Sequence, residues 1–337
     1  MRPTKRISLI LFTAAMLLPA VAEPSAAQRL ETPSLNLEDK IVLGAVKGRI
    51  DHMAFDPVRS RLFVAELENN SLGIVDLKQR KVVHVITGLA EPQGVGYEPS
   101  SDTLYVANGG DGSVRLFRGA DYAEIGRINL GDDADNIRID PGTKRVLVGY
   151  GRGAIATIDP VTRAKTADFP LPAHPEGFQL DRKTNQIFVN VPRSRAIVVL
   201  DGGSGQRKAT WPMKEAGANF PMILDEDAER VLVAFRSPPK LGVLSAGGGE
   251  PVASVELCGD ADDVFVDAKR ALVYASCGDG FLDILNARDH DYRRLARLPT
   301  VRGARTSLYV PSIDRLFLAV RSTSTEPAAV WVYRPVP

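Results

Sequence analysis

The sequence predicts an all-β fold, a seven-bladed β-propeller of four-stranded antiparallel blades. The first observation is a short apolar run, "RLFVAE" (61–66), that recurs with changes six times further along the chain. Its copies are "TLYVAN", "RVLVGY", "QIFVNV", "RVLVAF", "ALVYAS" and "RLFLAV". The second observation is that each copy lies in a unit with three further strand-like runs. Four short strands in a unit of about 40–45 residues form the pattern of a propeller blade.

The spacing of the units is nearly constant. Each unit opens like "GRIDHMAFDP" (49–58), with polar residues, a short apolar run and a turn. The residue that ends the apolar run anchors each repeat, and successive anchors are 42, 42, 41, 44, 42 and 43 residues apart. The anchors are Asp56, Glu98, Asp140, Asp181, Asp225, Asp267 and Val310. Such a regular period predicts one repeating architecture over the whole domain.

The four strands of a unit follow from its four runs. The apolar half of the opening segment is the innermost strand, and the "RLFVAE" run is the second. Runs such as "LGIVDL" form the third strand, and more polar runs such as "KVVHVITG" form the outer one. The second and third runs are almost continuously apolar, as expected where neighbouring blades cover both faces of a sheet. No helical periodicity follows the N-terminal segment.

The ends of the domain are expected to pair with each other. The seventh unit stops at "VWVYRPVP", one strand short, while "EDKIVLGAVKG" (38–48) has no unit of its own. We therefore expect this N-terminal segment to supply the missing outer strand. Such pairing closes the ring and removes two exposed strand edges.

Residues 1–22 have the pattern of a signal peptide. Arg2, Lys5 and Arg6 precede a twelve-residue apolar run, "ISLILFTAAMLL", and a small-residue cleavage site, "AVA" (20–22). The alternative is a buried N-terminal helix. The predicted organisation is a signal peptide (1–22), a linker (23–37) and a single propeller domain (38–337). The protein is thus expected to be periplasmic or secreted.

Charge and hydropathy exclude some partners. Residues 1–22 hold three of the 42 Lys and Arg and none of the 41 Asp and Glu, so the rest carries 39 against 41, a net charge of −2. This balance argues against nucleic acid as a partner. No stretch reaches the roughly 20 apolar residues of a membrane span, so we expect none. The protein is expected to be a monomer.

The strands resemble a known repeat. "LFVAE", "LYVAN" and "IFVNV", each followed by a turn and a strand of the form "xIxVxD", resemble the YVTN-type propeller repeat of exported bacterial proteins. The resemblance covers residues 38–334. It implies the propeller fold and a scaffold whose ligands differ between members, so function has to be argued from the site.

We expect the functional site at one end of the ring, the end at which the innermost strands begin. The turns at the other end, such as "DPVRS" and "DPGTK", carry ordinary hairpin residues. The loops before the innermost strands differ from blade to blade instead. Five residues before each anchor the blades carry Asp51, Gln93, Asp135, Glu176, Phe220, Asp262 and Arg305; at the next position they carry His52, Gly94, Asn136, Gly177, Pro221, Asp263 and Thr306.

Four carboxylates at one ring position would repel one another without compensation. The compensation could be arginine, a bound cation or solvent. The alternative is that these Asp residues only cap their loops by accepting backbone N–H bonds. The first functional hypothesis is non-catalytic binding of a small polar ligand or a protein partner. Its predicted contact residues are Asp51, His52, Gln93, Asn136, Arg152, His174, Arg193, Arg236 and Arg305.

The second hypothesis is a metal-dependent lactonase or esterase. "PEGFQLD" (175–181) resembles the opening Glu-Gly segment of gluconolactonase/regucalcin-type propellers, which hold one divalent cation with Glu, Asn and Asp. This resemblance implies a site for Ca²⁺, Mg²⁺ or Mn²⁺, with His52, His174 or a spare carboxylate as base. The implied metal ligands are Asp135 or Asn136, Glu176, and Asp262 or Asp263.

Two cysteines, Cys258 and Cys277, are the only ones in the chain, and both lie in "CGD" triplets of the sixth unit. In an exported protein such a pair favours a disulfide. A reduced pair in redox or soft-metal chemistry is the alternative.

Overall fold

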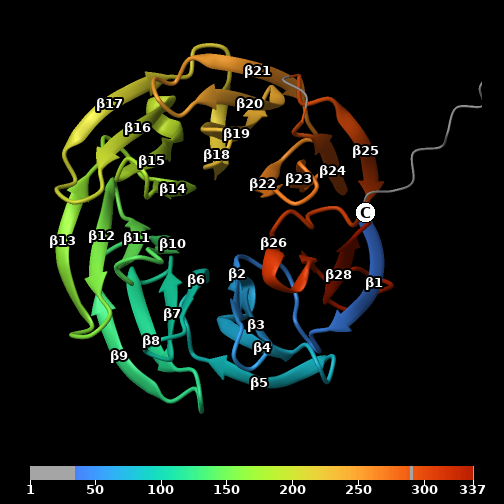
Figure 1. Cartoon of the computed structure of the whole chain (residues 1–337). Coiled ribbons are helices and arrows are strands. Elements are labelled where there is room, and N and C mark those ends of the chain that lie inside the picture. The colour runs from blue at the N-terminus through green and yellow to red at the C-terminus, as the bar shows by residue number, and fades with distance from the viewer. Residues whose placement is uncertain (1–34, 289–290, 337) are drawn as a thin grey trace, which may run out of the picture. The chain divides into compact units, whose positions relative to one another are not determined.

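The computed structural model describes residues 35–288 and 291–336. Seven four-stranded antiparallel sheets stand around a central axis, so the predicted seven-bladed propeller is confirmed (Figure 1). The predicted signal peptide and residues 23–34 of the predicted linker lie outside the described residues. No helix in the described part of the chain is long and apolar enough to cross a membrane.

The strands of each blade follow one another in the chain, from the innermost to the outermost. Blades 1 to 3 consist of β2 (Met53–Asp56), β3 (Arg61–Glu66), β4 (Ser71–Asp76) and β5 (Lys81–Thr87); β6 (Pro92–Glu98), β7 (Thr103–Asn108), β8 (Ser113–Arg118) and β9 (Glu124–Asn129); and β10 (Ala134–Ile139), β11 (Val146–Tyr150), β12 (Ala154–Asp159) and β13 (Ala164–Pro170). Blades 4 to 6 consist of β14 (Phe178–Asp181), β15 (Gln186–Val191), β16 (Ala196–Asp201) and β17 (Arg207–Pro212); β18 (Gly217–Asp225), β19 (Arg230–Ser237), β20 (Pro239–Ser245) and β21 (Pro251–Glu256); and β22 (Ala261–Asp267), β23 (Leu272–Cys277), β24 (Phe281–Asn286) and β25 (Arg294–Pro299). Blade 7 consists of β26 (Ser307–Val310), β27 (Arg315–Val320), β28 (Ala329–Pro335) and β1 (Leu35–Val42), and three short 3₁₀ helices are η1 (Leu67–Asn69), η2 (Pro192–Ser194) and η3 (Pro311–Ile313).

The N-terminal strand closes the ring. β1 pairs antiparallel with β28, with Leu35 opposite Pro335 and Val42 opposite Ala329 (Figure 1). The strand begins at Leu35, three residues before the expected segment 38–48, because pairing with β28 extends through Pro335. Blade 7 thus combines both ends of the described chain, which leaves no outer strand missing.

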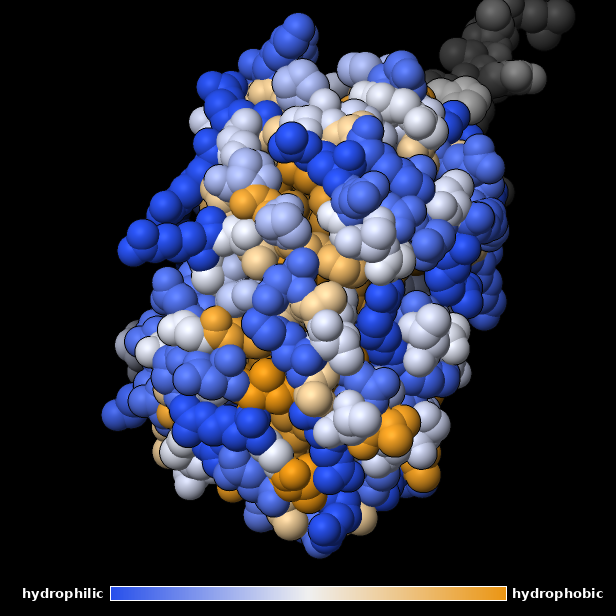
Figure 2. All heavy atoms as spheres, turned by 90° about the vertical axis from the view of Figure 1, so that its left-hand side faces the viewer, coloured by the Kyte–Doolittle hydropathy of each residue, from blue (hydrophilic) through white to orange (hydrophobic). Residues whose placement is uncertain are grey.

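The core lies between neighbouring blades. One cluster, for example, packs Phe63 and Leu72 of blade 1 against Val95 and Leu104 of blade 2. Burying one such side chain stabilises the fold by about 1.5–3 kcal/mol, and each interface contains about a dozen. The outermost strands face solvent on one side. Figure 2 shows the side of the ring on which β13 lies, where hydrophilic residues predominate.

The two ends of the ring differ in their loops. We call the end where the innermost strands begin the top face, and the end where they finish the bottom face. At the bottom, an Asp at the end of a strand accepts backbone N–H bonds from the turn that follows. Asp56 Oδ1, for instance, accepts from the amides of Val58 (2.8 Å) and Arg59 (3.1 Å). These turns are therefore built to fix the chain reversal.

Candidate functional site

A cavity opens at the centre of the top face. Its volume is about 610 Å³, and the loops before the innermost strands build most of its wall together with the loops after the second strands. The lining residues are Arg49, Gln93, Asp132, Asp133, Asp135, Gly151, Arg152, His174, Glu176, Pro192, Arg193, Phe220, Arg236, Asp262 and Arg305. We call this cavity the mouth.

A narrow passage of about 40 Å³ continues from the mouth into the central channel. It is lined by Arg49, Asp51, His52, Asp135, Asn136, Arg138, Glu176, Gly177, Phe220, Pro221, Met222, Asp262 and Asp263. Apart from the cysteines, every predicted site residue lines the mouth or this passage. The structure therefore brings the predicted set together, and binding by that set stays a prediction.

Two glycines explain how the blades come close enough to form the passage. A Cβ atom on Gly94 would lie 2.0 Å from the carbonyl oxygen of Asp135, and one on Gly177 would lie 2.8 Å from that of Phe220. The Gly177 amide also donates to the Phe220 carbonyl (3.0 Å). Glycine at this position lets the neighbouring blade approach, which sets the distances across the mouth.

Two arginines form a clamp on one side of the mouth. Arg236 and Arg305 both pair with Asp262, and Arg305 Nε lies 2.9 Å from its Oδ2. Both also pair with Asp260, at 3.2 Å from Arg236 and 2.8 Å from Arg305. Arg236 further lies 4.0 Å over the Phe220 ring, a cation–π geometry. The charge of Asp262 is thus compensated by arginine.

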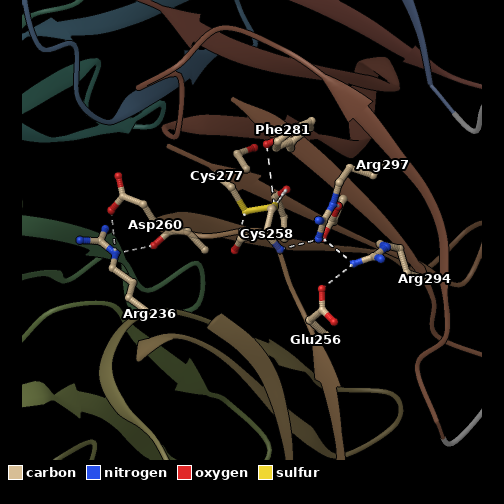
Figure 3. Close-up of a disulfide and its surroundings, with 12 residues drawn as sticks. Arg236, Glu256, Cys258, Asp260, Cys277, Phe281, Arg294 and Arg297 are labelled. Carbon is tan, nitrogen blue, oxygen red and sulfur yellow. Dashed lines mark hydrogen bonds and ion pairs between the residues drawn. A yellow bond between two sulfur atoms is a disulfide. The ribbon is translucent and has the colours of Figure 1, made fainter. Parts of the chain in front are cut away.

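A disulfide holds the loop that carries the two carboxylates bound by this clamp, Asp260 and Asp262. Cys258 and Cys277 are bonded, as predicted, and both are buried (Figure 3). The Cys258 amide donates to the buried carboxylate of Asp283 (2.8 Å), which Arg297 holds from the other side (2.6 Å). Asp260 follows Cys258 by two residues and reaches Arg236 (Figure 3). The disulfide therefore restrains the loop that places Asp260 beside Arg236.

The opposite side of the mouth is acidic. Burial and the nearby Asp135 raise the pKa of Glu176 from 4.5 to about 8, and the Glu176 carboxyl has no hydrogen bond or ion pair within the described residues. His174 Nδ1 lies 2.6 Å from the Gly151 carbonyl and 3.6 Å from Asp133. Burial opposes protonation of His174, but Asp135, the Gly151 carbonyl and Asp133 outweigh it and raise the pKa to about 9. At neutral pH, Glu176 is therefore mostly neutral and His174 mostly cationic.

The passage holds a second cluster of carboxylates, Asp51 and Asp263, on either side of His52. His52 lies 3.8 Å from a carboxylate oxygen of Asp51 and 3.8 Å from one of Asp263. Burial raises the pKa of Asp51 to about 6 and that of Asp263 to about 7. Burial opposes protonation of His52, but its two carboxylate neighbours raise its pKa. Arg49 (2.7 Å) compensates Asp51, and the Ser307 amide (2.7 Å) donates to Asp263.

Two cations on the rim have no such compensation. Arg152 and Arg193 lie in the loops after β11 and β15, on the neighbouring blades 3 and 4, and both line the mouth. Neither side chain forms an ion pair or hydrogen bond with the residues that the structure describes. Both are exposed. These guanidinium groups are free to bind an anion that enters the mouth.

The implied metal ligands are not grouped as a metal site. Within residues 35–288 and 291–336, no three or more His, Cys, Asp or Glu side chains are placed to hold one ion together. Of the implied ligands Asp135, Glu176, Asp262 and Asp263, Asp262 is held by arginine and Asp263 by a backbone amide and His52. The repulsion expected between carboxylates is relieved by cations of the chain and by raised pKa values.

Sequence reasoning did not single out two residues of the channel, Arg49 and Arg138. Arg49 precedes the ring position by two residues and compensates Asp51. Arg138 lies two residues before its anchor. A charged residue at a position that is uncharged in every other blade is the signal that could have identified Arg138. The equivalents in the other blades are Ala54, Gly96, Gln179, Ile223, Phe265 and Leu308.

Comparisons with known proteins support the fold. The structure is similar to a chain of Kuenenia stuttgartiensis hydrazine synthase, with a TM-score of 0.75 and 20% identity over 88% of this chain and 96% of that one. It is also similar to a chain of a mitotic checkpoint complex, with a TM-score of 0.74 and 12% identity over 95% and 99%. No family model and no curated protein matches the sequence. Similarity at such identities shows the propeller fold, and the site has to carry any argument about function.

Proposed function

We propose that the protein is a non-catalytic binding protein whose mouth takes up a small organic anion. The observation that carries this proposal is the pair of uncompensated guanidinium groups, Arg152 and Arg193, on the rim of the mouth. Arginine binds carboxylate and phosphate groups through paired, charge-assisted hydrogen bonds. An anionic ligand would supply the counter-charge that the chain itself does not supply.

Three other arginines and Glu176 do not oppose this ligand class, whereas Asp132, Asp133 and Asp135 line the same cavity with the opposite charge. Arg49, Arg236 and Arg305 have carboxylate partners and contribute little net charge. Glu176 is mostly neutral at pH 7 and can donate a hydrogen bond to a ligand oxygen. The volume of about 610 Å³ lies within the range of roughly 300–1,000 Å³ that is typical of small-molecule sites.

The test is calorimetric titration with small molecules of similar size and different charge: succinate and phosphate as anions, glycerol as a neutral compound and putrescine as a cation. We expect an anion to bind and the double variant Arg152→Ala/Arg193→Ala to lose at least tenfold in affinity. The matched control is Arg207→Ala in the outer strand β17, which removes an exposed arginine away from the mouth. Equal affinities in the wild type and the double variant would contradict the proposal, as would binding of putrescine alone.

One observation favours the lactonase as a second candidate. The Glu176 carboxyl lines the mouth and has no hydrogen-bond or ion-pair partner in residues 35–288 and 291–336, and its raised pKa of about 8 suits transfer of a proton near neutral pH. A hydrolase of this kind would open gluconolactone in the presence of Ca²⁺, Mg²⁺ or Mn²⁺ and lose this activity in Glu176→Gln. If no divalent cation supports hydrolysis, only the binding function is kept.

We further propose that the protein acts outside the cytoplasm as a member of the YVTN-type family. The buried disulfide supports an oxidising compartment, and residues 1–22 have the order of a signal peptide. Mass spectrometry of the protein exported by a bacterial host tests the first point. The expected N-terminus is Glu23, and a chain that keeps residues 1–22 would contradict export by cleavage.

A further inference from the structure

A third cavity lies in the channel beyond the passage. Its volume is about 310 Å³, and we call it the chamber. All seven innermost strands or the residues next to them contribute to its wall: His52, Met53, Ala54, Gly94, Val95, Ile137, Arg138, Gln179, Met222, Ile223, Asp263, Val264, Phe265, Ser307 and Leu308. Aliphatic and aromatic side chains predominate in this wall, unlike the wall of the mouth.

Polar groups gather where the chamber meets the passage. His52, Arg138, Met222 and Asp263 line both spaces. His52 and Asp263 face each other at 3.8 Å, and Asp263 also accepts the Ser307 amide (2.7 Å). These two groups therefore have partners in the chain.

Arg138 differs from them. Its only hydrogen bond in the described residues is from Nη1 to the Ile137 carbonyl (2.8 Å), and it forms no ion pair there. Its guanidinium lies 5.5 Å from the centre of the Phe178 ring. Burial lowers the pKa of Arg138, although the more distant Asp263 and Asp135 act in the opposite direction. A buried arginine without an ion pair is costly unless an anion accompanies it.

We propose that the chamber is a second binding site, for a small monoanion with an apolar body such as a short-chain fatty carboxylate. Arg138 contacts the carboxylate, and the apolar body lies against Met53, Val95 and Met222. Binding supplies the counter-charge of Arg138 and removes apolar surface from water. This site is distinct from the mouth because the passage between them holds only about 40 Å³.

The methionines allow a direct test. Of the five methionines in the chain, Met53 and Met222 line the chamber, whereas Met213 is buried in the hydrophobic core between blades 4 and 5. NMR spectra of protein with ¹³C-labelled methionine methyl groups therefore report on the chamber and contain an internal control. The probes are hexanoate, hexanol as the same body without charge, and chloride as the charge without the body.

We expect hexanoate to shift the Met53 and Met222 signals in a saturable way and to leave Met213 unchanged. Hexanol and chloride should bind at least tenfold more weakly. Arg138→Met should lose the hexanoate response, and Arg138→Lys should retain part of it because it keeps the charge. If Arg138→Met does not fold, as judged by the Met213 signal, the lysine variant and the chain-length series from acetate to hexanoate still decide.

The proposal would be overturned by no shift with hexanoate, by an equal response to chloride, or by full binding in Arg138→Met. Loss of the response in Arg152→Ala/Arg193→Ala would assign the ligand to the mouth, and would also overturn it. In the opposite case, hexanoate binding that survives in this double variant supports the chamber whether or not the mouth binds succinate.

Discussion

The pKa values of carboxylates on the two faces of the ring are shifted in opposite directions. On the bottom face, turn carboxylates with a shifted pKa have it lowered, as Asp76, Asp140 and Asp201 do. The cause at Asp76 and Asp201 is hydrogen bonds from backbone amides, and at Asp140 hydrogen bonds that outweigh burial. On the top face, burial raises the pKa of Glu176 and Asp263. The bottom carboxylates thus stabilise the fold in their charged form, whereas the top ones are held at a cost.

This contrast between the faces indicates which of them binds a ligand. A charged side chain whose hydrogen bonds and ion pairs all lie within its own chain has little capacity to bind a ligand. The carboxylates of the bottom turns are of this kind. Groups whose pKa values are shifted by burial and by each other concentrate at functional sites. The top face combines such groups with Arg152 and Arg193, which have no hydrogen-bond or ion-pair partner among the described residues. Mutations on the bottom face should therefore change mainly stability, and mutations on the top face mainly binding.

The largest expected effect is on the bottom face. Arg270 bridges the buried Asp267 (2.9 Å) and Asp314 (2.7 Å) of the next blade. Arg270→Ala should lower the free energy of unfolding by about 3–5 kcal/mol, because it leaves a buried carboxylate without its cation. Arg152→Ala on the top face is the matched control and should change it by less than about 0.5 kcal/mol. Urea unfolding of both variants checks this, and similar losses would refute the contrast between the faces.

The second-largest effect concerns the disulfide between Cys258 and Cys277 on the top face. Replacing both Cys258 and Cys277 by Ala should cost about 3 kcal/mol, as the chain-entropy model gives for a loop closed over a separation of 19 residues. The Ser/Ser variant separates this cost from that of burying two hydroxyl groups. The transition midpoint in urea is the measurement. A loss under about 1 kcal/mol would mean that the hydrogen bonds of Asp283 hold this loop by themselves.

The fold was predictable from the sequence because a propeller repeats its hydrophobic pattern in every blade. Seven copies of one pattern fix the number of strands, their order and the closing strand, since each copy has to bury the same faces. Part of the lining of the mouth was predictable for the complementary reason, because residues such as Asp135, Glu176 and Asp262 break the repeat at one ring position. Their partners were not. Nothing in the spacing shows that Arg236 and Arg305 share Asp262, because these pairs join different blades.

Arg138 shows a second limit of the sequence. A charged side chain at an otherwise uncharged inner position is visible once the repeats are aligned. Whether it has a counter-ion depends on side chains from other blades, at sequence distances that no local pattern covers. The disulfide was predictable because it joins two residues of one blade.

A smaller effect concerns pH. Glu176 titrates at about 8 in the folded protein against 4.5 ordinarily, so the folded state holds its proton more tightly. The free energy of unfolding therefore falls as the pH rises from about 4.5 to 8. Glu176→Gln should remove this fall and raise the Tm by a few degrees at pH 8 but little at pH 5. Some fall should persist in this variant, because the raised pKa values of Asp51 (about 6) and Asp263 (about 7) act in the same direction below pH 7. The raised pKa of His174 adds a fall from pH 6.5 to about 9.

The bottom face supplies the control for this titration. The lowered pKa of Asp201 stabilises the fold above pH 3.8 and loses this effect only at lower pH. Asp201→Asn should therefore lower the Tm by the same amount at pH 5 and pH 8. A steeper pH dependence in Asp201→Asn, or an unchanged one in Glu176→Gln, would show that the two faces do not differ in the way described.

The smallest expected effect is that of divalent cations. Arginines hold Asp262, and a backbone amide and His52 hold Asp263, so a cation would have to displace these partners. Thermal unfolding in EDTA and then with Ca²⁺, Mg²⁺, Mn²⁺ or Zn²⁺ should give Tm values within one degree of each other. A site saturated a hundredfold above its Kd would add about 2.7 kcal/mol. A gain of that size, abolished by Glu176→Ala but kept in Arg152→Ala, would place a metal on the acidic side of the mouth and favour the lactonase.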